Sequence, residues 1–219
     1  MYVTYTRIYG WSDYGGESSY QPGYRLENMM WMTLLVYDYI IPGEKKMSEG
    51  RELALQVIDE VEKAVVGKRK ILEKIMTAIL AGGHILIEDI PGVGKTTLAL
   101  AFSKVLGLDY QRIQFTPDIM PTDIAGFSIY HQGSEEFEFK EGAAMTNLLL
   151  ADEINRTSPK TQSALLEAME EGQITVDGIT RDLPDPYIVI ATQNPFGSIG
   201  THSLPESQLD RFMIRTSLG

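Results

Sequence analysis

After residue 47 the apolar residues recur at two spacings, which predict two kinds of element. Apolar positions three or four residues apart are typical of a helix with one buried face, whereas short apolar runs indicate buried strands. Helices are predicted over residues 49–65, 68–81, 95–106 and 159–171, and strands over 84–87, 110–115, 148–151 and 187–192. Because buried strands alternate with helices, the pattern favours an α/β fold built on a parallel sheet.

Two further segments predict β-hairpins outside this alternation. Apolar and polar residues alternate over 127–141 around Gln132-Gly133-Ser134. The second hairpin, 173–181, turns at Asp177-Gly178, a dipeptide favoured in two-residue hairpin turns. The segment 116–126, which precedes the first hairpin, is rich in Pro and Asp and is interpreted as a structured loop.

Composition then excludes several kinds of chemistry. The 219 residues include no cysteine, which excludes disulfides, thiolate metal sites and cysteine nucleophiles. The three histidines, His84, His131 and His202, form no close pair in the sequence, which argues against a histidine-rich metal centre. Each is interpreted as a solvated or capping residue. The net charge of −11 argues against a nucleic acid as the main partner.

The chain divides into two unequal parts. Residues 1–46 hold 8 of the 11 tyrosines and both tryptophans but carry a net charge of only −1, which leaves −10 for residues 47–219. We interpret 1–46 as an aromatic-rich N-terminal extension of uncertain status and 47–219 as the core domain. The apolar stretch 29–37 is shorter than the ~20 residues that a membrane span needs. We therefore expect a cytoplasmic protein without a membrane span.

The clearest chemical motif lies between the predicted strand 84–87 and the predicted helix 95–106. Its glycines would turn backbone N–H groups toward a phosphate at a helix N-terminus, its lysine adds positive charge, and its hydroxyls can coordinate Mg²⁺. The strict pattern G-x-x-x-x-G-K-[ST] fails only at its first position, where Asp89 replaces glycine. We interpret the motif as a P-loop for ATP or ADP, whose contacts to the nucleotide come from Pro91, Gly92, Val93, Gly94, Lys95, Thr96 and Thr97.

A P-loop ATPase also needs acidic residues on a neighbouring strand, and the predicted strand 148–151 is followed by Asp152-Glu153. Ligands bind at the carboxyl ends of such parallel strands. Asp152 and Thr96 are predicted to hold Mg²⁺, with the carboxylate acting directly or through water. Glu153 is predicted to polarise the attacking water, and Lys95 to contribute to catalysis through its charge.

Three more polar residues are candidates for the same site. Asn194 follows the predicted strand 187–192 and is expected to position the attacking water. Arg211 has the planar charge needed to reach a γ-phosphate from a neighbouring subunit. Arg215 is the competing candidate for that role.

These motifs resemble the MoxR branch of the AAA+ ATPases, in the same order and spacing over about two-thirds of the chain. The matching strings are VVGK (65–68), AGGHILIEDIPGVGKTTLA (81–99), QFTPDIMPTDIAGF (114–127), NLLLADEINRTSPKTQSALLEAMEE (147–171), ATQNP (191–195) and LPESQLDRF (204–212). An acidic residue ahead of the P-loop is usual in this branch, which accounts for Asp89.

The resemblance implies a fold and further site residues. The expected fold is a three-layer αβα P-loop NTPase core of AAA+ type, with a mainly parallel five-stranded sheet and two inserted hairpins that face a ring and its pore. A ring, usually a hexamer, would complete each site. The resemblance also places Val66 and Gly67 beside the adenine and lets Arg156 meet a neighbouring subunit. A helical lid is expected after Gly219, while residues 1–46 have no counterpart and are either an extension or a stretch ahead of the true start.

The function implied by the resemblance is ATP-driven, chaperone-like remodelling or maturation of client protein complexes, with a von Willebrand factor A domain protein as a possible partner. Three alternatives stay open. One is a metal-chelatase-type AAA+ motor subunit, and another is a nucleotide-gated scaffold without turnover, against which the presence of Glu153 and Arg211 argues. The third is a DNA-translocating motor, which the negative charge disfavours.

Overall fold

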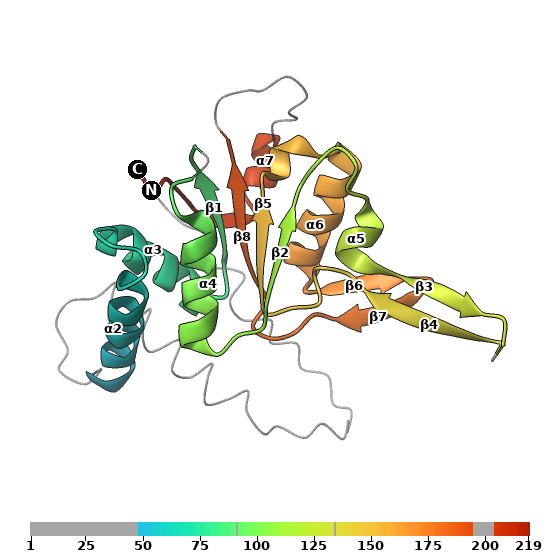
Figure 1. Ribbon diagram of the computed structural model, residues 1–219, viewed down its shortest axis with the longest axis horizontal. Coiled ribbons are helices and arrows are strands. Elements are labelled where there is room, and N and C mark those ends of the chain that lie inside the picture. Colours follow the sequence, from blue (N-terminus) through green and yellow to red (C-terminus); the bar gives the residue numbers. More distant parts are fainter. Residues whose placement is uncertain (1–47, 91, 134, 195–203) are drawn as a thin grey trace, which may run out of the picture.

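The computed structural model describes residues 48–90, 92–133, 135–194 and 204–219. Its centre is a five-stranded sheet in which every pair of neighbouring strands is parallel (Figure 1). In spatial order the strands are β2 (Tyr110–Gln114), β5 (Leu148–Asp152), β8 (Ile188–Gln193), β1 (His84–Glu88) and β9 (Phe212–Thr216). This sheet confirms the predicted α/β class.

Helices cover both faces of the sheet and give three layers (Figure 1). One face carries α2 (Ser48–Glu62), α3 (Arg69–Leu80) and α4 (Lys95–Leu106), and the other carries α5 (Pro121–Ala125) and α6 (Pro159–Glu171). Successive strand residues point to opposite faces. Leu148 and Leu150 of β5 therefore join the core on the α2–α4 side, whereas Leu149 joins the core on the α6 side. The αβα architecture expected from the resemblance is confirmed.

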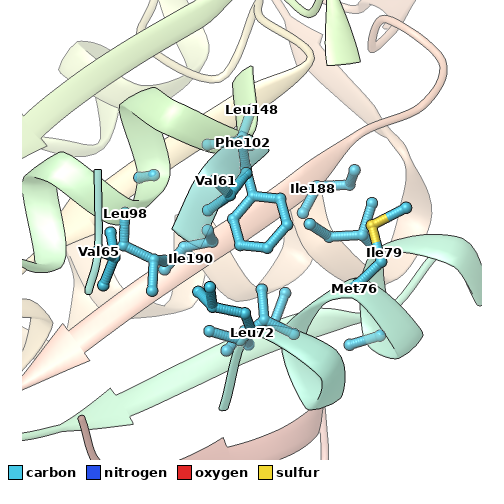
Figure 2. Close-up of a cluster of buried hydrophobic side chains, with 14 of the residues drawn as sticks. Val61, Val65, Leu72, Met76, Ile79, Leu98, Phe102, Leu148, Ile188 and Ile190 are labelled. Atoms are coloured by element: carbon cyan, nitrogen blue, oxygen red, sulfur yellow. The ribbon is translucent and has the colours of Figure 1, made fainter. Parts of the chain in front are cut away.

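The core on the α2–α4 side holds the phosphate-loop helix against the sheet. Phe102 of α4 is fully buried among apolar side chains from α2, α3 and the strands (Figure 2). Its labelled neighbours in Figure 2 include Val61, Leu72, Leu98, Leu148, Ile188 and Ile190. Fully burying one such side chain contributes roughly 1.5–3 kcal/mol. This packing fixes α4, and with it the loop that precedes α4, relative to β1.

Most of the predicted elements form within a few residues of their expected bounds. α4 and α6 occupy the predicted ranges 95–106 and 159–171. α2 ends at Glu62 rather than at residue 65, because residues 63–67 form turns. The predicted strands 84–87, 110–115, 148–151 and 187–192 correspond to β1, β2, β5 and β8.

Four short elements form where the apolar pattern predicted none. These are α5, the 3-10 helix η1 (Ile154–Arg156), α7 (Glu206–Leu209) and β9. α5 lies inside the segment interpreted as a loop, where the Asp123 carboxylate accepts a 2.8 Å hydrogen bond from the Met120 N–H and caps the helix. β9 is the edge strand next to β1, and its partly exposed sequence gives no clear apolar run.

Both predicted hairpins form and pack on the α6 side of the body. The first consists of β3 (Gly126–His131) and β4 (Glu136–Glu141), and the second of β6 (Gln173–Val176) and β7 (Ile179–Asp182). The β3–β4 hairpin projects beyond the rest of the domain (Figure 1). The Arg181 guanidinium lies 3.8 Å from the centre of the Phe139 ring and joins the two hairpins.

His84 differs from its interpretation as a solvated residue. It is buried with 8% exposure, Nδ1 accepts a 3.0 Å hydrogen bond from the Val189 N–H, and Nε2 lies 3.1 Å from the Met169 oxygen. The imidazole thus connects β1 to β8 and α6. It is buried because β8 and α6 both pack over the first residue of β1. His131 is exposed on the β3–β4 hairpin and contacts Glu138 at 2.6 Å.

Several predictions lie outside the described residues. They concern the extension 1–46, Pro91 of the P-loop and His202, so the domain boundary at residue 47 stays a prediction. Within the described ranges, no helix combines the length and the apolar content that crossing a bilayer requires.

Candidate nucleotide-binding site

The loop from β1 to α4 has the backbone form that a phosphate site needs. Gly94, the N-cap of α4, has φ of 95°, and Gly92 has φ of 90°. Both values lie in the left-handed region, where a residue with a Cβ would be strained. A Cβ at either glycine would find no atom within 4 Å, so the space over the loop is open. No side chain caps the first N–H groups of α4, which leaves them able to bind an anion.

Lys95 lies at the start of α4 with its ammonium group directed back to the loop. The residue is buried, and Nζ donates a 2.9 Å hydrogen bond to the backbone oxygen of Asp89. Thr96 and Thr97 follow it and are exposed, as is Gly92, while Val93 and Gly94 are partly exposed. The described part of the predicted P-loop therefore forms a single cradle of main-chain N–H groups with one ammonium and adjacent hydroxyls.

Asp152 and Glu153 lie at the carboxyl end of β5, and β8 orients both. Thr192 of β8, which is fully buried, donates a 2.6 Å hydrogen bond to Asp152 Oδ1 and accepts one of 2.9 Å from the Glu153 N–H. Glu153 has φ of 58°, a conformation that turns the chain sharply after the strand. One hydroxyl thus fixes the Asp152 side chain and the Glu153 backbone together.

Strand β2 supplies polar partners to both carboxylates. Arg112 donates a 2.7 Å hydrogen bond to Asp152 Oδ2, and Gln114 donates one of 2.9 Å to Glu153 Oε2. Arg156 donates to the same Glu153 oxygen at 2.8 Å. In this chain Arg156 contacts Glu153, and its expected contact with a neighbouring subunit stays a prediction.

Sequence reasoning missed Arg112, Gln114 and Thr192. A usable signal existed for two of them, because Gln114 opens the string QFTPDIMPTDIAGF and Thr192 lies within ATQNP. Arg112 is an exposed strand residue with no motif around it, and only the register between Gln114 and Asp152 brings it to the site.

The P-loop and the acidic pair are connected through β8, which lies between β1 and β5. The Asp89 N–H donates a 3.2 Å hydrogen bond to the Gln193 oxygen at the end of β8. Asn194 follows directly, is partly buried, and its backbone oxygen accepts a 3.2 Å hydrogen bond from Asn155 Nδ2. The carboxyl ends of three adjacent parallel strands thus bring the P-loop, the acidic pair and Asn194 to one edge of the sheet.

The two candidate arginines are both paired within their own chain. Arg211 donates to Glu170 Oε2 of α6 from Nε at 3.0 Å and from a terminal nitrogen at 2.6 Å. Arg215 forms an ion pair with Glu88 at the end of β1, and this interaction raises the pKa of Arg215. Which of the two arginines reaches the γ-phosphate of a neighbouring subunit therefore stays a prediction.

Val66 and Gly67, predicted to border the adenine, lie in the turn between α2 and α3. Val66 is 79% exposed, and Gly67 has φ of 76°, which suits glycine at this turn. The next residue, Lys68, donates a 2.9 Å hydrogen bond from Nζ to the Gly219 oxygen. Because Asp89 also bonds to Gly219, this turn and the P-loop share a common contact.

The residues present fit a nucleotide with Mg²⁺. The Thr96 hydroxyl and the Asp152 carboxylate are hard oxygen donors of the kind Mg²⁺ prefers. Among the described residues no three His, Cys, Asp or Glu side chains gather into a metal site. Magnesium held here would therefore need oxygen ligands from water and phosphate, which is its usual coordination in such sites.

The sequence is similar to those of known proteins. The AAA_3 family model, described as "ATPase family associated with various cellular activities (AAA)", matches residues 84–214. The chain is 55% identical over 164 residues to the uncharacterized protein YeaC of Bacillus subtilis, covering 75% of this chain and 51% of YeaC. It is 46% identical to the chaperone MoxR1 of Mycobacterium tuberculosis, covering 75% of this chain and 44% of MoxR1. The chain thus spans about half the length of these relatives.

Solved structures show the same fold. The crystal structure of a candidate ATPase from Cytophaga hutchinsonii superposes with a TM-score of 0.65 at 42% sequence identity, covering 80% of this chain and 55% of that one. The sheet, the loop geometry and these similarities agree. The chain belongs to the ATPase family associated with various cellular activities (AAA), as a MoxR-type AAA+ ATPase domain.

Proposed function

We propose that this chain is the core of a cytoplasmic motor that hydrolyses ATP in a ring, usually a hexamer, and uses the energy to remodel or mature client protein complexes. One observation carries the proposal. The P-loop after β1 and the Asp152-Glu153 pair at the end of β5 lie on either side of β8 and are hydrogen-bonded to it. A phosphate cradle beside a carboxylate base is the arrangement that phosphoryl transfer to water requires.

Each residue then has a part in hydrolysis. The N–H groups of 92–97 and the Lys95 ammonium would bind the phosphates, and Thr96 with Asp152 would hold Mg²⁺, which when bound neutralises phosphate charge. Lys95 would exchange its contact with the Asp89 oxygen for a phosphate oxygen.

Glu153 would polarise the attacking water. Both side-chain hydrogen bonds described for its carboxylate use Oε2, so Oε1 is the oxygen we assign to the water. Asn194, at the end of β8, would orient the same water. The partners Gln114 and Arg156 would fix the direction of the carboxylate, because both donate hydrogen bonds to Oε2.

The β3–β4 hairpin supports a protein client. Tyr130 and Phe137 form a ring pair with centroids 5.1 Å apart at the projecting end, and they are 49% and 73% exposed. An exposed aromatic pair favours binding to another molecule. The neighbouring acidic residues are Glu135, Glu136 and Glu138, so we propose a client segment that carries apolar and basic side chains. One relative is the chaperone MoxR1, and a chaperone acts on protein clients. A von Willebrand factor A domain protein remains a proposed partner.

Mixing two inactive variants tests whether the sites are shared between subunits. R211A removes the proposed trans-acting arginine, and E153Q removes the proposed base. Each alone should lower ATP turnover at least about a hundredfold while nucleotide binding persists. In an equal mixture, about a quarter of the interfaces would pair an intact Glu153 with an intact Arg211. The rate of phosphate release should therefore return to about a quarter of the wild-type rate.

The matched control is R51A, because Arg51 is exposed in the first turn of α2, at the opposite end of that helix from the turn that contains Val66 and Gly67. R51A should hydrolyse ATP as the wild type does. A mixture of R211A and E153Q that shows only the sum of the two separate activities would contradict a shared site. Repeating the experiment with R215A in place of R211A decides between the two arginines.

A further inference from the structure

Asp89, the residue that departs from the strict P-loop pattern, fastens the loop to a distant part of the chain. Its Oδ2 accepts three hydrogen bonds from the segment after β9, and the donors are the Leu218 N–H at 2.7 Å, the Gly219 N–H at 3.1 Å and the Ser217 hydroxyl at 3.1 Å. Its Oδ1 accepts a 2.9 Å hydrogen bond from the Ile90 N–H. The residue is only 8% exposed, so little water competes for these bonds.

The backbone of the same residue touches the nucleotide site. The Asp89 N–H donates to Gln193 at the end of β8, and its oxygen accepts from the Lys95 ammonium. A glycine at this position, as the strict motif has, could make the backbone contacts but none of the side-chain contacts. Asp89 therefore connects Lys95, β8 and the segment 217–219.

The segment 217–219 is itself anchored on its other side. Leu218 is 1% exposed and belongs to the core that also contains Val65 and Leu72. Lys68, which follows the turn predicted to border the adenine, donates to the Gly219 oxygen. Both the phosphate end and the proposed adenine end of the site thus contact 217–219.

Asp89 is suited to transmit a change because its carboxylate is ionised and bonded to main-chain N–H groups. Burial by itself would raise the pKa of Asp89, but the hydrogen bonds from Leu218, Ile90, Gly219 and Ser217 outweigh burial and lower the pKa. Hydrogen bonds to an ionised acceptor are stronger than those between neutral groups.

We propose that Asp89 is a positioning residue that couples nucleotide in the P-loop to the order of residues 217–219. The proposal rests on the nucleotide site of the proposed function. Phosphate binding draws Lys95 away from the Asp89 oxygen, the peptide at Asp89 adjusts, and the carboxylate carries the adjustment to Leu218. Coupling between two sites is reciprocal, so loosening 217–219 also changes nucleotide affinity by the same factor.

Hydrogen exchange at the backbone N–H groups of Leu218 and Gly219 tests the coupling in the intact protein. The measurement is made with and without Mg²⁺ and ADP, on the wild type, D89N and D89G. D89N replaces one acceptor oxygen of the carboxylate with an NH₂ group, which cannot accept a hydrogen bond from a main-chain N–H. D89G removes the side chain and restores the strict P-loop motif. In the wild type, ADP should slow exchange at Leu218 several-fold. In both variants the nucleotide-free exchange should be at least about tenfold faster than in the wild type, and ADP should no longer change it.

Each arm of the experiment has a separate meaning. Failure of ADP to bind the wild type would contradict the proposed function. ADP binding with a wild-type response of Leu218 exchange in D89N would overturn the coupling while leaving the function intact. D89N keeps this test usable if D89G does not fold. The matched control is D177N in the exposed β6–β7 turn, where asparagine tolerates φ of 53° and exchange at Leu218 should match the wild type.

Discussion

At the scale of single residues, buried polar groups join strands that the chain brings together from far apart. His84 begins β1 and bonds to Val189 of β8 and Met169 of α6, and its ring meets Tyr187 edge to face at 5.9 Å between centroids. Burial lowers the pKa of His84 below its ordinary value of 6.5. The histidine therefore stabilises the fold in its neutral form.

This burial predicts a pH dependence of stability. Because the folded state lowers the pKa of His84, the unfolded chain binds more protons once the pH falls below about 6.5. The stabilisation is complete above that pH and is lost as the pH falls through it, by at most about 1.4 kcal/mol per pH unit. Urea unfolding of H84Q should show about 1 kcal/mol less loss of stability between pH 7.5 and pH 5.5 than the wild type shows.

The control for this measurement is R51A, which changes an exposed residue of α2 that does not titrate between pH 5.5 and pH 7.5. R51A should lose as much stability on acidification as the wild type. Equal pH dependence in H84Q and the wild type would show that the buried imidazole does not govern the response.

The candidate site could be predicted from the sequence only where its residues are contiguous. Lys95 and Thr96 lie in one string and Asp152-Glu153 in another, and the structure brings both strings to one edge of the sheet. Thr192 and Gln114 orient the carboxylates from other strands. Their part depends on strand register, which a local pattern does not contain.

At the scale of elements, the base of the β3–β4 hairpin depends on a close approach of backbone. Gly126 begins β3 with φ of 93°, and a Cβ there would lie 2.4 Å from the Lys140 oxygen and 2.8 Å from Phe139 Cζ. The oxygen belongs to the backbone of β4 and cannot move aside without breaking the ladder. G126A should therefore destabilise the domain by about 2–4 kcal/mol.

Gly133 in the turn of the same hairpin provides the control. A Cβ at Gly133 would meet no atom within 4 Å, so G133A should change the free energy of unfolding by less than about 0.5 kcal/mol. Urea unfolding of the two variants measures the difference. Equal stability of G126A and G133A would be incompatible with the packing at the hairpin base.

Elements with a strong apolar pattern were predictable, and short ones were not. α4 and α6 form at their predicted bounds because each presents a regular apolar face and ends at glycine. α5 was missed because five residues are too few for a helical period, and its capping by Asp123 decides its formation. β9 was missed because Phe212–Thr216 is an edge strand that mixes buried and exposed positions.

At the scale of the whole molecule, the order of the strands creates the site. β8 separates β1 from β5, so a strand without phosphate-binding or acidic residues of its own joins the two motifs through Thr192 and Gln193. The apolar pattern predicts parallel strands but not their order, because order depends on which helix crosses which face. The five-stranded sheet was predicted from the resemblance to AAA+ proteins, whereas the connection through β8 is seen only in the structure.

ATP binding and ATP hydrolysis measured together on the wild type and E153Q test the central claim most directly. Glutamine keeps the size of the side chain and can still accept from Gln114 and Arg156, but it cannot polarise water as a carboxylate does. We predict ATP affinity within about threefold of the wild type and phosphate release lower by at least about a hundredfold. The control K95A should lose binding as well as turnover. Wild-type phosphate release by E153Q would contradict the assignment of this domain as an ATPase that uses Glu153.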